Sequence, residues 1–287
     1  MRVSFRFFWP GFKSDNNIFL SVLRLGFENI EVVNNPNESD LIFQSLFGIE
    51  SQNLGVRNVV TFIGEPTLPT RNWGVTLGFK KNSEKEGHYY LPLHLLQFAW
   101  LDAESDQGNP ELRIPISNVY RNRSFLGSRF KRILFSSVFN HDPSGNRFAV
   151  LRELERKKIP IYAYGKPFKN GGFSDYQKLE LYNHSFFSMA FESTLLEGYQ
   201  TEKIVHSYFG GSVPVSWGWL DSCINRDSII ELSNFRSPEE LVDYLSEIAA
   251  DESTYRKIYE QPLYTKNPTL DNVVLPILKA VARAQTL

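Results

Sequence analysis

Residues 191–218, FESTLLEGYQTEKIVHSYFGGSVPVSWG, hold the charged side chains whose types and spacing point most directly to chemistry. An apolar run ends at Glu192, a glycine-containing loop follows, and apolar residues at helical spacing predict a helix that begins near Gln200. Residues 201–203, Thr-Glu-Lys, then form the first turn of that helix. A helix N-terminus carries unpaired N–H groups and about half a positive charge, so this turn is typical of a phosphate-binding site.

Glu202 and Lys203 allow two interpretations of this turn. In the first, Lys203 adds a full positive charge beside a bound phosphate, and Glu202 contacts the sugar attached to that phosphate. In the second, Glu202 only complements the helix dipole and Lys203 is a solvated surface residue. The residues alone leave both interpretations open.

Glu65 stands two residues after another apolar run, 59–63, in the segment VVTFIGEP. A single carboxylate at a strand end can accept the proton of an attacking hydroxyl, and partial burial there would raise its pKa toward a useful range. A third junction, 140–147, contains His141 and Asp142, whose pattern favours a plain turn. The chain has no Asp-x-Asp, HExxH or GxSxG motif, so neither a metal-held leaving group nor serine hydrolase chemistry is indicated.

The elements that position these residues alternate between strand and helix. Hydrophobic patterning predicts strands at 3–9, 30–33, 41–43, 59–63, 132–139, 159–164, 186–191 and 213–217, and helices at 17–26, 146–157, 200–209 and 238–250. This order favours an α/β protein with two Rossmann-like parallel-sheet lobes. A polar stretch with little periodicity, 103–129, is the expected linker. Ligands of open parallel sheets bind beyond the carboxyl ends of the strands, which is where the candidate residues stand.

Composition and charge exclude several classes of protein. The chain has 287 residues, and 31 Lys and Arg against 32 Asp and Glu leave a net charge of -1, which disfavours an electrostatic nucleic-acid binder. The single cysteine, Cys223, cannot form an intrachain disulfide or supply a cysteine-based zinc site. No apolar run is long enough to span a bilayer. We therefore expect a soluble, cytoplasmic protein without a transmembrane segment.

Four motifs resemble the alpha-1,3/1,4-fucosyltransferases of glycosyltransferase family 10. Residues 191–218 are similar to the family's donor-binding motif, Phe-Glu-Asn-Ser followed by Tyr-x-Thr-Glu-Lys and a Pro-Val-x-x-Gly element. The segments SDLIFQSLFG (39–48), VVTFIGEPTLP (59–69) and HYYLPLHL (88–95) resemble first-lobe motifs of the same family, in the same order. The resemblance therefore covers both predicted lobes.

The resemblance implies a role for each matching residue. It makes Glu65 the general base, Arg147 a ligand of the donor phosphate, and Tyr199, Glu202 and Lys203 contacts of GDP-fucose. Glu202 joins Glu65 among the catalytic residues because its carboxylate would also steady positive charge at the anomeric carbon.

Three departures from the family pattern accompany these matches. Glu192 and Ser193 occupy the Phe-Glu-Asn-Ser positions of the donor site, with serine in place of asparagine. Pro66 replaces the asparagine after Gly-Glu, and the segment with Tyr89 and Tyr90 lacks the family's arginines. We therefore expect an unusual acceptor, bound through Trp73, Tyr89 and Tyr90.

The resemblance further implies the GT-B architecture, with two Rossmann-like lobes facing a cleft. We assign residues 1–124 to an acceptor-binding lobe, 125–270 to a GDP-fucose-binding lobe, and 271–287 to a C-terminal helix that packs back on the first lobe. The expected reaction is inverting transfer of L-fucose from GDP-fucose to a hydroxyl of an oligosaccharide or glycoconjugate, in alpha-1,3 linkage. No metal or cofactor is required in this reaction, and Mn or Mg would at most stimulate it.

Two alternatives remain open at this stage. One is a related GT-B transferase that uses another nucleotide sugar. The other is a catalytically silent module that binds a nucleotide sugar. A screen of donors with analysis of the product linkage distinguishes them.

Overall fold

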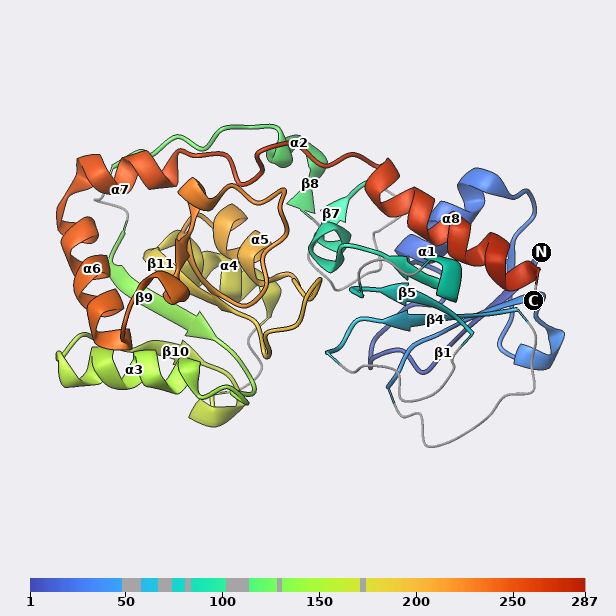
Figure 1. The fold of residues 1–287 in the computed structure, drawn as a ribbon, viewed down its shortest axis with the longest axis horizontal. Helices are drawn as coiled ribbons and strands as arrows, with labels where there is room; N and C mark the ends of the chain where they lie inside the picture. The colour runs from blue at the N-terminus through green and yellow to red at the C-terminus, as the bar shows by residue number, and fades with distance from the viewer. Residues whose placement is uncertain are drawn as a thin grey trace. The chain divides into compact units, whose positions relative to one another are not determined.

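The computed structural model describes residues 1–47, 58–66, 74–80, 84–101, 114–127, 131–170 and 174–286. The chain divides into two compact units, each of which is drawn in Figure 1. Unit 1 comprises residues 1–113, 197–199 and 269–287, and unit 2 comprises residues 114–196 and 200–268. Each unit is built around one parallel sheet, as the alternating pattern of the sequence predicts.

Unit 1 contains a six-stranded parallel sheet in the order β2-β1-β3-β4-β5-β6. Its strands are β1 (Arg2–Arg6), β2 (Glu31–Val32), β3 (Leu41–Gln44), β4 (Val59–Ile63), β5 (Val75–Gly78) and β6 (His88–Tyr90), with a short β7 at Phe98–Ala99. Its helices are α1 (Ile18–Gly26) and α8 (Asp271–Gln285), and α8 packs against β4, β5 and β6 (Figure 1). The C-terminal helix is therefore part of the same hydrophobic core as the N-terminal strands.

Phenylalanines fill much of the core of unit 1. Phe43 of β3 stacks on Phe19 of α1 and on Phe5 of β1, with ring centroids 5.2 Å and 5.6 Å apart. Helix α1 begins where the Asn17 side chain accepts a hydrogen bond from the Leu20 N–H. This cap fixes the start of α1, so its apolar face meets the aromatic residues of the sheet.

Unit 2 contains a five-stranded parallel sheet in the order β10-β9-β11-β12-β13. Its strands are β8 (Ile114–Pro115), outside this sheet, and β9 (Ile133–Val138), β10 (Tyr162–Tyr164), β11 (Ser185–Phe191), β12 (Val213–Trp217) and β13 (Ile230–Glu231) within it. Its helices are α2 (Ile116–Val119), α3 (Asn146–Arg156), α4 (Asp175–Asn183), α5 (Lys203–Phe209), α6 (Pro238–Ala250) and α7 (Glu252–Tyr259). β11 lies at the centre of the sheet, between β9 and β12.

Helices cover both faces of the unit 2 sheet. Apolar residues of α3, α6 and α7 pack with one face of β9, β11 and β12 in a single hydrophobic cluster. Helices α4 and α5 pack on β11 from the other side, where Ser188 of β11 hydrogen-bonds the Ser207 and Ser212 hydroxyls at 2.5 Å each. Buried hydroxyls that satisfy one another allow the sheet and α5 to approach closely without an unpaired polar group.

The boundary between the units lies earlier than residue 124, where the sequence placed it. Unit 2 begins at Ile114 and includes residues 114–124, which the sequence analysis assigns to the first lobe. The guanidinium of Arg123 donates to the carbonyls of Tyr208, Ser212 and Tyr259, and Phe125 is buried in the core of unit 2. The segment resembles a linker in composition because it is polar. The polar side chain of Arg123 nevertheless bonds main-chain carbonyls of unit 2, and composition does not reveal such contacts.

Candidate active site

Glu192, the first residue after β11, organises the junction between β11 and α5. Its side chain is only 5% exposed, and it accepts hydrogen bonds from the Thr201 N–H at 2.7 Å and from the Thr201 hydroxyl at 2.9 Å and 3.0 Å. The Lys203 ammonium donates to Glu192 Oε2 at 3.0 Å and to Thr201 Oγ1 at 2.6 Å. The loop after β11 therefore returns to the end of that strand, where the Glu192 carboxylate fixes the position of the Lys203 ammonium.

Glu202 lies between two lysine side chains at the start of α5. Its Oε1 is 3.6 Å from Lys203 Nζ and 3.8 Å from Lys178 Nζ, and its side chain is one-third exposed. Partial burial raises the pKa of Glu202, but the charges of Lys203 and Lys178 outweigh that effect and hold it well below the ordinary value. Glu202 is therefore a carboxylate throughout the physiological pH range.

His206, one turn further along α5, is buried beside Lys178. Lys178 Nζ lies 2.9 Å from His206 Nδ1. Burial, followed by the charge of Lys178, lowers the pKa of His206 to about 3. The imidazole is therefore neutral, and the positive charge of this pair is on the lysine.

The predicted helix start near Gln200 is three residues too early. Helix α5 begins at Lys203 with Glu202 as its N-cap. Both residues before Glu202 are in tertiary hydrogen bonds instead: Thr201 with Glu192, and the Gln200 side-chain oxygen with the Asp221 N–H at 2.7 Å. These non-local bonds prevent the helix from extending backward.

Gly218, after β12, permits the close approach of its backbone to Glu192. Its φ is +136°, in the region that favours glycine. A Cβ at this position would lie 2.9 Å from Glu192 Cβ. The glycine that ends the family-like motif therefore leaves room for the carboxylate that organises the site.

Arg147 lies under the carboxyl ends of two strands of unit 2. It is 4% exposed, and its guanidinium donates to the Phe191 carbonyl at 2.6 Å and also to the His141 carbonyl. The guanidinium carbon lies 5.3 Å from the centre of the Phe139 ring. Arg147 thus joins the loops after β9 and β11, at the edge of the sheet where Glu192 and Lys203 lie. Its contact with a donor phosphate stays a prediction, as does that of Ser193, which is half-buried beside Glu192.

The predicted base and acceptor residues belong to unit 1. Glu65 follows β4 directly and is exposed, so the expected partial burial of this carboxylate is wrong. Tyr89 is buried in β6, and Tyr90 beside it is half-buried. Trp73 lies outside the described residues. Their assignment to catalysis and acceptor binding stays a prediction.

Tyr199 is grouped with unit 1, together with residues 197 and 198, although the chain on either side of these three residues belongs to unit 2. It is 3% exposed and packs edge-on against Phe79, with ring centroids 5.1 Å apart. Gly198 precedes it with φ of +81°, and a Cβ there would overlap the Phe79 carbonyl oxygen. The predicted contact of Tyr199 with the donor stays a prediction.

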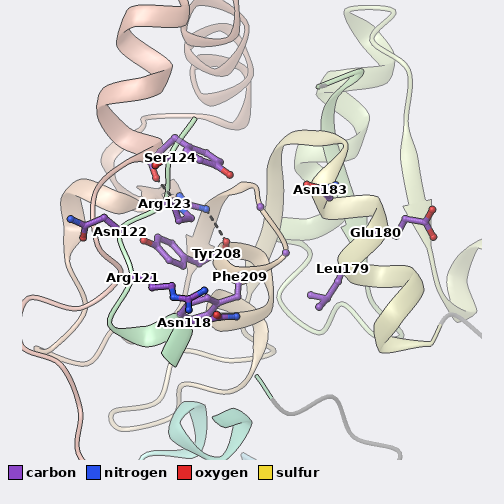
Figure 2. Close-up of a pocket in the computed structure, with 13 residues that line it drawn as sticks. Asn118, Arg121, Asn122, Arg123, Ser124, Leu179, Glu180, Asn183, Tyr208 and Phe209 are labelled. Carbon is purple, nitrogen blue, oxygen red and sulfur yellow. Dashed lines mark hydrogen bonds between the residues drawn. The ribbon is translucent and has the colours of Figure 1, made fainter. Parts of the chain in front are cut away.

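A pocket of about 630 Å³ in unit 2 lies away from these residues (Figure 2). Asn183, Gly210 and Gly211, which line it, precede β11 and β12, so the pocket is at the amino ends of the strands. Arg123 forms part of its wall, with its guanidinium between the rings of Tyr208 and Tyr259. Glu192 and Lys203 stand at the opposite, carboxyl, ends of the same strands.

The described part of the chain contains neither a candidate metal-binding cluster nor a candidate membrane-spanning helix. No three His, Cys, Asp or Glu side chains gather there in a way that could hold a metal ion. None of the helices in the described segments has the length and apolar character needed to cross a bilayer.

Lys178 and His206 were missed by the sequence reasoning. Lys178 comes from α4, about a dozen residues before the motif, and α4 itself was not predicted. A usable signal was present: Ser174 and Gln177 form a capping box, each side chain bonding the other's backbone N–H. That box would have placed a helix at 175–183 and Lys178 in its first turn.

Comparisons with known proteins agree on one family. The model of "glycosyltransferase family 10 (fucosyltransferase) C-term" matches residues 128–266. A Helicobacter pylori protein named alpha-(1,3)-fucosyltransferase FucT is 24% identical over 255 residues, which cover 80% of this chain and 53% of the relative. A mouse protein named 4-galactosyl-N-acetylglucosaminide 3-alpha-L-fucosyltransferase 9 is 32% identical over 123 residues, 41% of this chain and 33% of the relative.

The chain therefore spans about half the length of the bacterial relative and a third of the mouse one. A crystal structure of an alpha1,3-fucosyltransferase with GDP-fucose matches with a TM-score of 0.72 and 21% identity, covering 100% of this chain and 90% of that one. A structure of such an enzyme with GDP matches with a TM-score of 0.71. This likeness confirms the expected GT-B type of fold with two parallel-sheet lobes. Residues 128–266 therefore match the C-terminal part of glycosyltransferase family 10 (fucosyltransferase) proteins.

Proposed function

We propose that this protein transfers L-fucose from GDP-fucose to a hydroxyl of an oligosaccharide or glycoconjugate, with inversion at the anomeric carbon and in alpha-1,3 linkage. The observation that carries the proposal is the ordered array of charges after β11, in which Glu192, Lys203 and Glu202 occupy the positions of the family's donor motif. The relatives named as alpha-1,3-fucosyltransferases support the donor and the linkage.

The proposed reaction needs a proton acceptor on the acceptor side of the fucose and positive charge on the diphosphate side. The acceptor oxygen forms a bond to the anomeric carbon while the bond from that carbon to the diphosphate oxygen breaks, and GDP leaves with the electron pair. The proton of the acceptor hydroxyl goes to a carboxylate base, which we assign to Glu65. Negative charge that develops on GDP is stabilised by Lys203 and Arg147.

Glu202 has a separate role in the proposed site. Its carboxylate is ionised, so it can accept hydrogen bonds from fucose hydroxyls and stabilise positive charge at the anomeric carbon. Both interactions strengthen as the transition state forms, and GDP alone offers neither. The proposed reaction needs no metal ion, because the protein supplies its own cations, and Mn or Mg would at most stimulate it.

The Glu65→Gln variant tests the reaction and its base together. The amide retains shape and hydrogen bonding but cannot accept a proton, so we expect turnover with GDP-fucose to fall by about two to four orders of magnitude. GDP affinity, measured by calorimetry, should stay within about twofold, since the variant removes only an interaction of the acceptor. Near-normal turnover in the variant would refute the assignment of Glu65, and absence of transfer by the wild-type protein in a screen of acceptors would refute the reaction.

A further inference from the structure

Lys178 reaches the candidate active site from a helix outside the donor motif. It is the fourth residue of α4, its side chain is 10% exposed, and its ammonium meets two side chains of α5. One is Glu202, at 3.8 Å from Nζ to Oε1, and the other is His206, at 2.9 Å from Nζ to Nδ1. A buried ammonium is costly unless it is hydrogen-bonded and paired with an opposite charge, and Lys178 meets both conditions here.

The hydrogen bond between Lys178 and His206 fixes which nitrogen of the imidazole carries a proton. An ammonium group can only donate, so His206 Nδ1 must accept, and the neutral ring carries its hydrogen on Nε2. His206 is therefore a neutral acceptor that directs the Lys178 ammonium. A protonated imidazole at this place would repel both lysines, which is consistent with the lowered pKa of His206.

The charges around Glu202 alternate in sign. Lys178 approaches it from α4 and Lys203 from α5, while His206 is neutral and the Glu192 carboxylate of the β11 end pairs with Lys203. Lys203 pairs with both the Glu192 and the Glu202 carboxylates, so its positive charge compensates that of Glu202 only in part. Lys178 supplies the second positive charge beside the same oxygen, Glu202 Oε1.

We propose that Lys178 is a positioning residue of the donor site, which keeps Glu202 ionised and directs its carboxylate, with His206 as the acceptor that fixes the lysine. This inference rests on the proposed function, since it assigns Glu202 to the sugar of a bound donor. Lys178 acts through Glu202. A protonated Glu202 would lose acceptor capacity toward sugar hydroxyls and would no longer stabilise positive charge.

The test uses two neutral variants, Lys178→Met and Lys178→Gln, with Lys178→Arg as the variant that retains the charge. Lys157→Met is the matched control, because it removes another lysine of unit 2 that pairs with a carboxylate, Asp243, at 2.5 Å. We expect kcat with GDP-fucose to fall at least about tenfold in both neutral variants, and the titration midpoint of the Glu202 carboxyl to rise by about one pH unit. Lys178→Arg should restore much of both, and Lys157→Met should change neither.

A purely structural role for Lys178 predicts a different result. It would lower the melting temperature of the neutral variants while the Glu202 titration midpoint and kcat stay in place, and that outcome would overturn the proposal. Lys178→Gln can still donate to His206, so it keeps unit 2 folded if the methionine variant does not.

A measurement independent of activity separates this inference from the proposed function. The Glu202 carboxyl can be titrated by ¹³C NMR in wild-type protein and in Lys178→Gln, with its signal assigned from Glu202→Gln. A titration midpoint that rises in the variant supports the positioning role even where no fucose transfer is found. Equal midpoints would overturn it even where transfer is normal.

Discussion

Replacing Glu192 with glutamine tests whether this carboxylate holds the junction between β11 and α5 together. Glutamine can still accept from the Thr201 N–H through its oxygen. In the wild type, Glu192 Oε2 accepts from the Thr201 hydroxyl at 2.9 Å and from Lys203 Nζ at 3.0 Å. In the variant an NH₂ group replaces Oε2, and an amide NH₂ cannot accept from either donor. The substitution therefore removes the contact with Lys203 and one of the two contacts with the Thr201 hydroxyl, and it weakens the Thr201 bonds to Oε1 that remain.

The magnitude follows from burial. Glu192 is 5% exposed, so its hydrogen bonds are not offset by solvent, whereas Lys203 is 23% exposed and can be partly solvated after the change. Hydrogen bonds to charged groups contribute about 1.5–3 kcal/mol each, and we reduce the Lys203 contribution for solvent screening. We expect unit 2 to lose about 2–4 kcal/mol of unfolding free energy.

Denaturant titration followed by hydrogen exchange is the appropriate assay, because a chain with two units need not unfold in one step. Exchange of peptides from β9 and β12 reports unit 2. Glu231→Gln is the control, since its partner Arg226 is 61% exposed, and we expect less than about 1 kcal/mol for it. Equal losses in the two variants would refute the view that Glu192 is the organising residue of the junction.

Two further predictions concern other buried groups of unit 2. Arg123→Met should destabilise unit 2 by about 3–5 kcal/mol, because three carbonyls lose a charged donor and two tyrosine rings lose a cation between them (Figure 2); a urea titration that gives a loss below about 1 kcal/mol would contradict this. The pKa of His206 is about 6.5 in the unfolded chain and about 3 in the folded protein, so the free energy of unfolding falls as pH drops from 6.5 toward 3. Between pH 7 and pH 5 this loss should be about 2 kcal/mol in the wild type, and it should be absent from the pH dependence of His206→Gln when the two are unfolded in parallel.

The sequence predicted best the elements whose ends are set by local signals. β4 and β12 match residue for residue, and α6 begins at Pro238, where the Ser237 hydroxyl accepts from the Glu240 N–H as its cap. These strands are continuous apolar runs, and the helix combines a cap with an apolar stripe. Local pattern is sufficient where no tertiary bond competes with it.

Elements defined by tertiary contacts were shifted or missed. α5 starts late because Thr201 is bonded to Glu192, and α4 was missed although its sequence carries a capping box. In the site, motif resemblance placed Glu192, Glu202 and Lys203 together, and the structure brings them into contact. The motif could not supply Lys178, because that residue comes from another helix and its role depends on distance in space.

Lys203 is the residue at which folding and donor binding compete. In the structure its ammonium is bonded to Glu192 and Thr201, which stabilises the junction. A donor diphosphate in the proposed site would need hydrogen bonds from the same ammonium, so some of that stabilisation must be given up or shared when the donor binds. The same ammonium also lies 3.6 Å from Glu202 Oε1, so a phosphate oxygen would join carboxylates that already hold the lysine in place. Glu192 fixes the position of this cation before a donor binds, which is a physical reason for a buried glutamate beside Lys203.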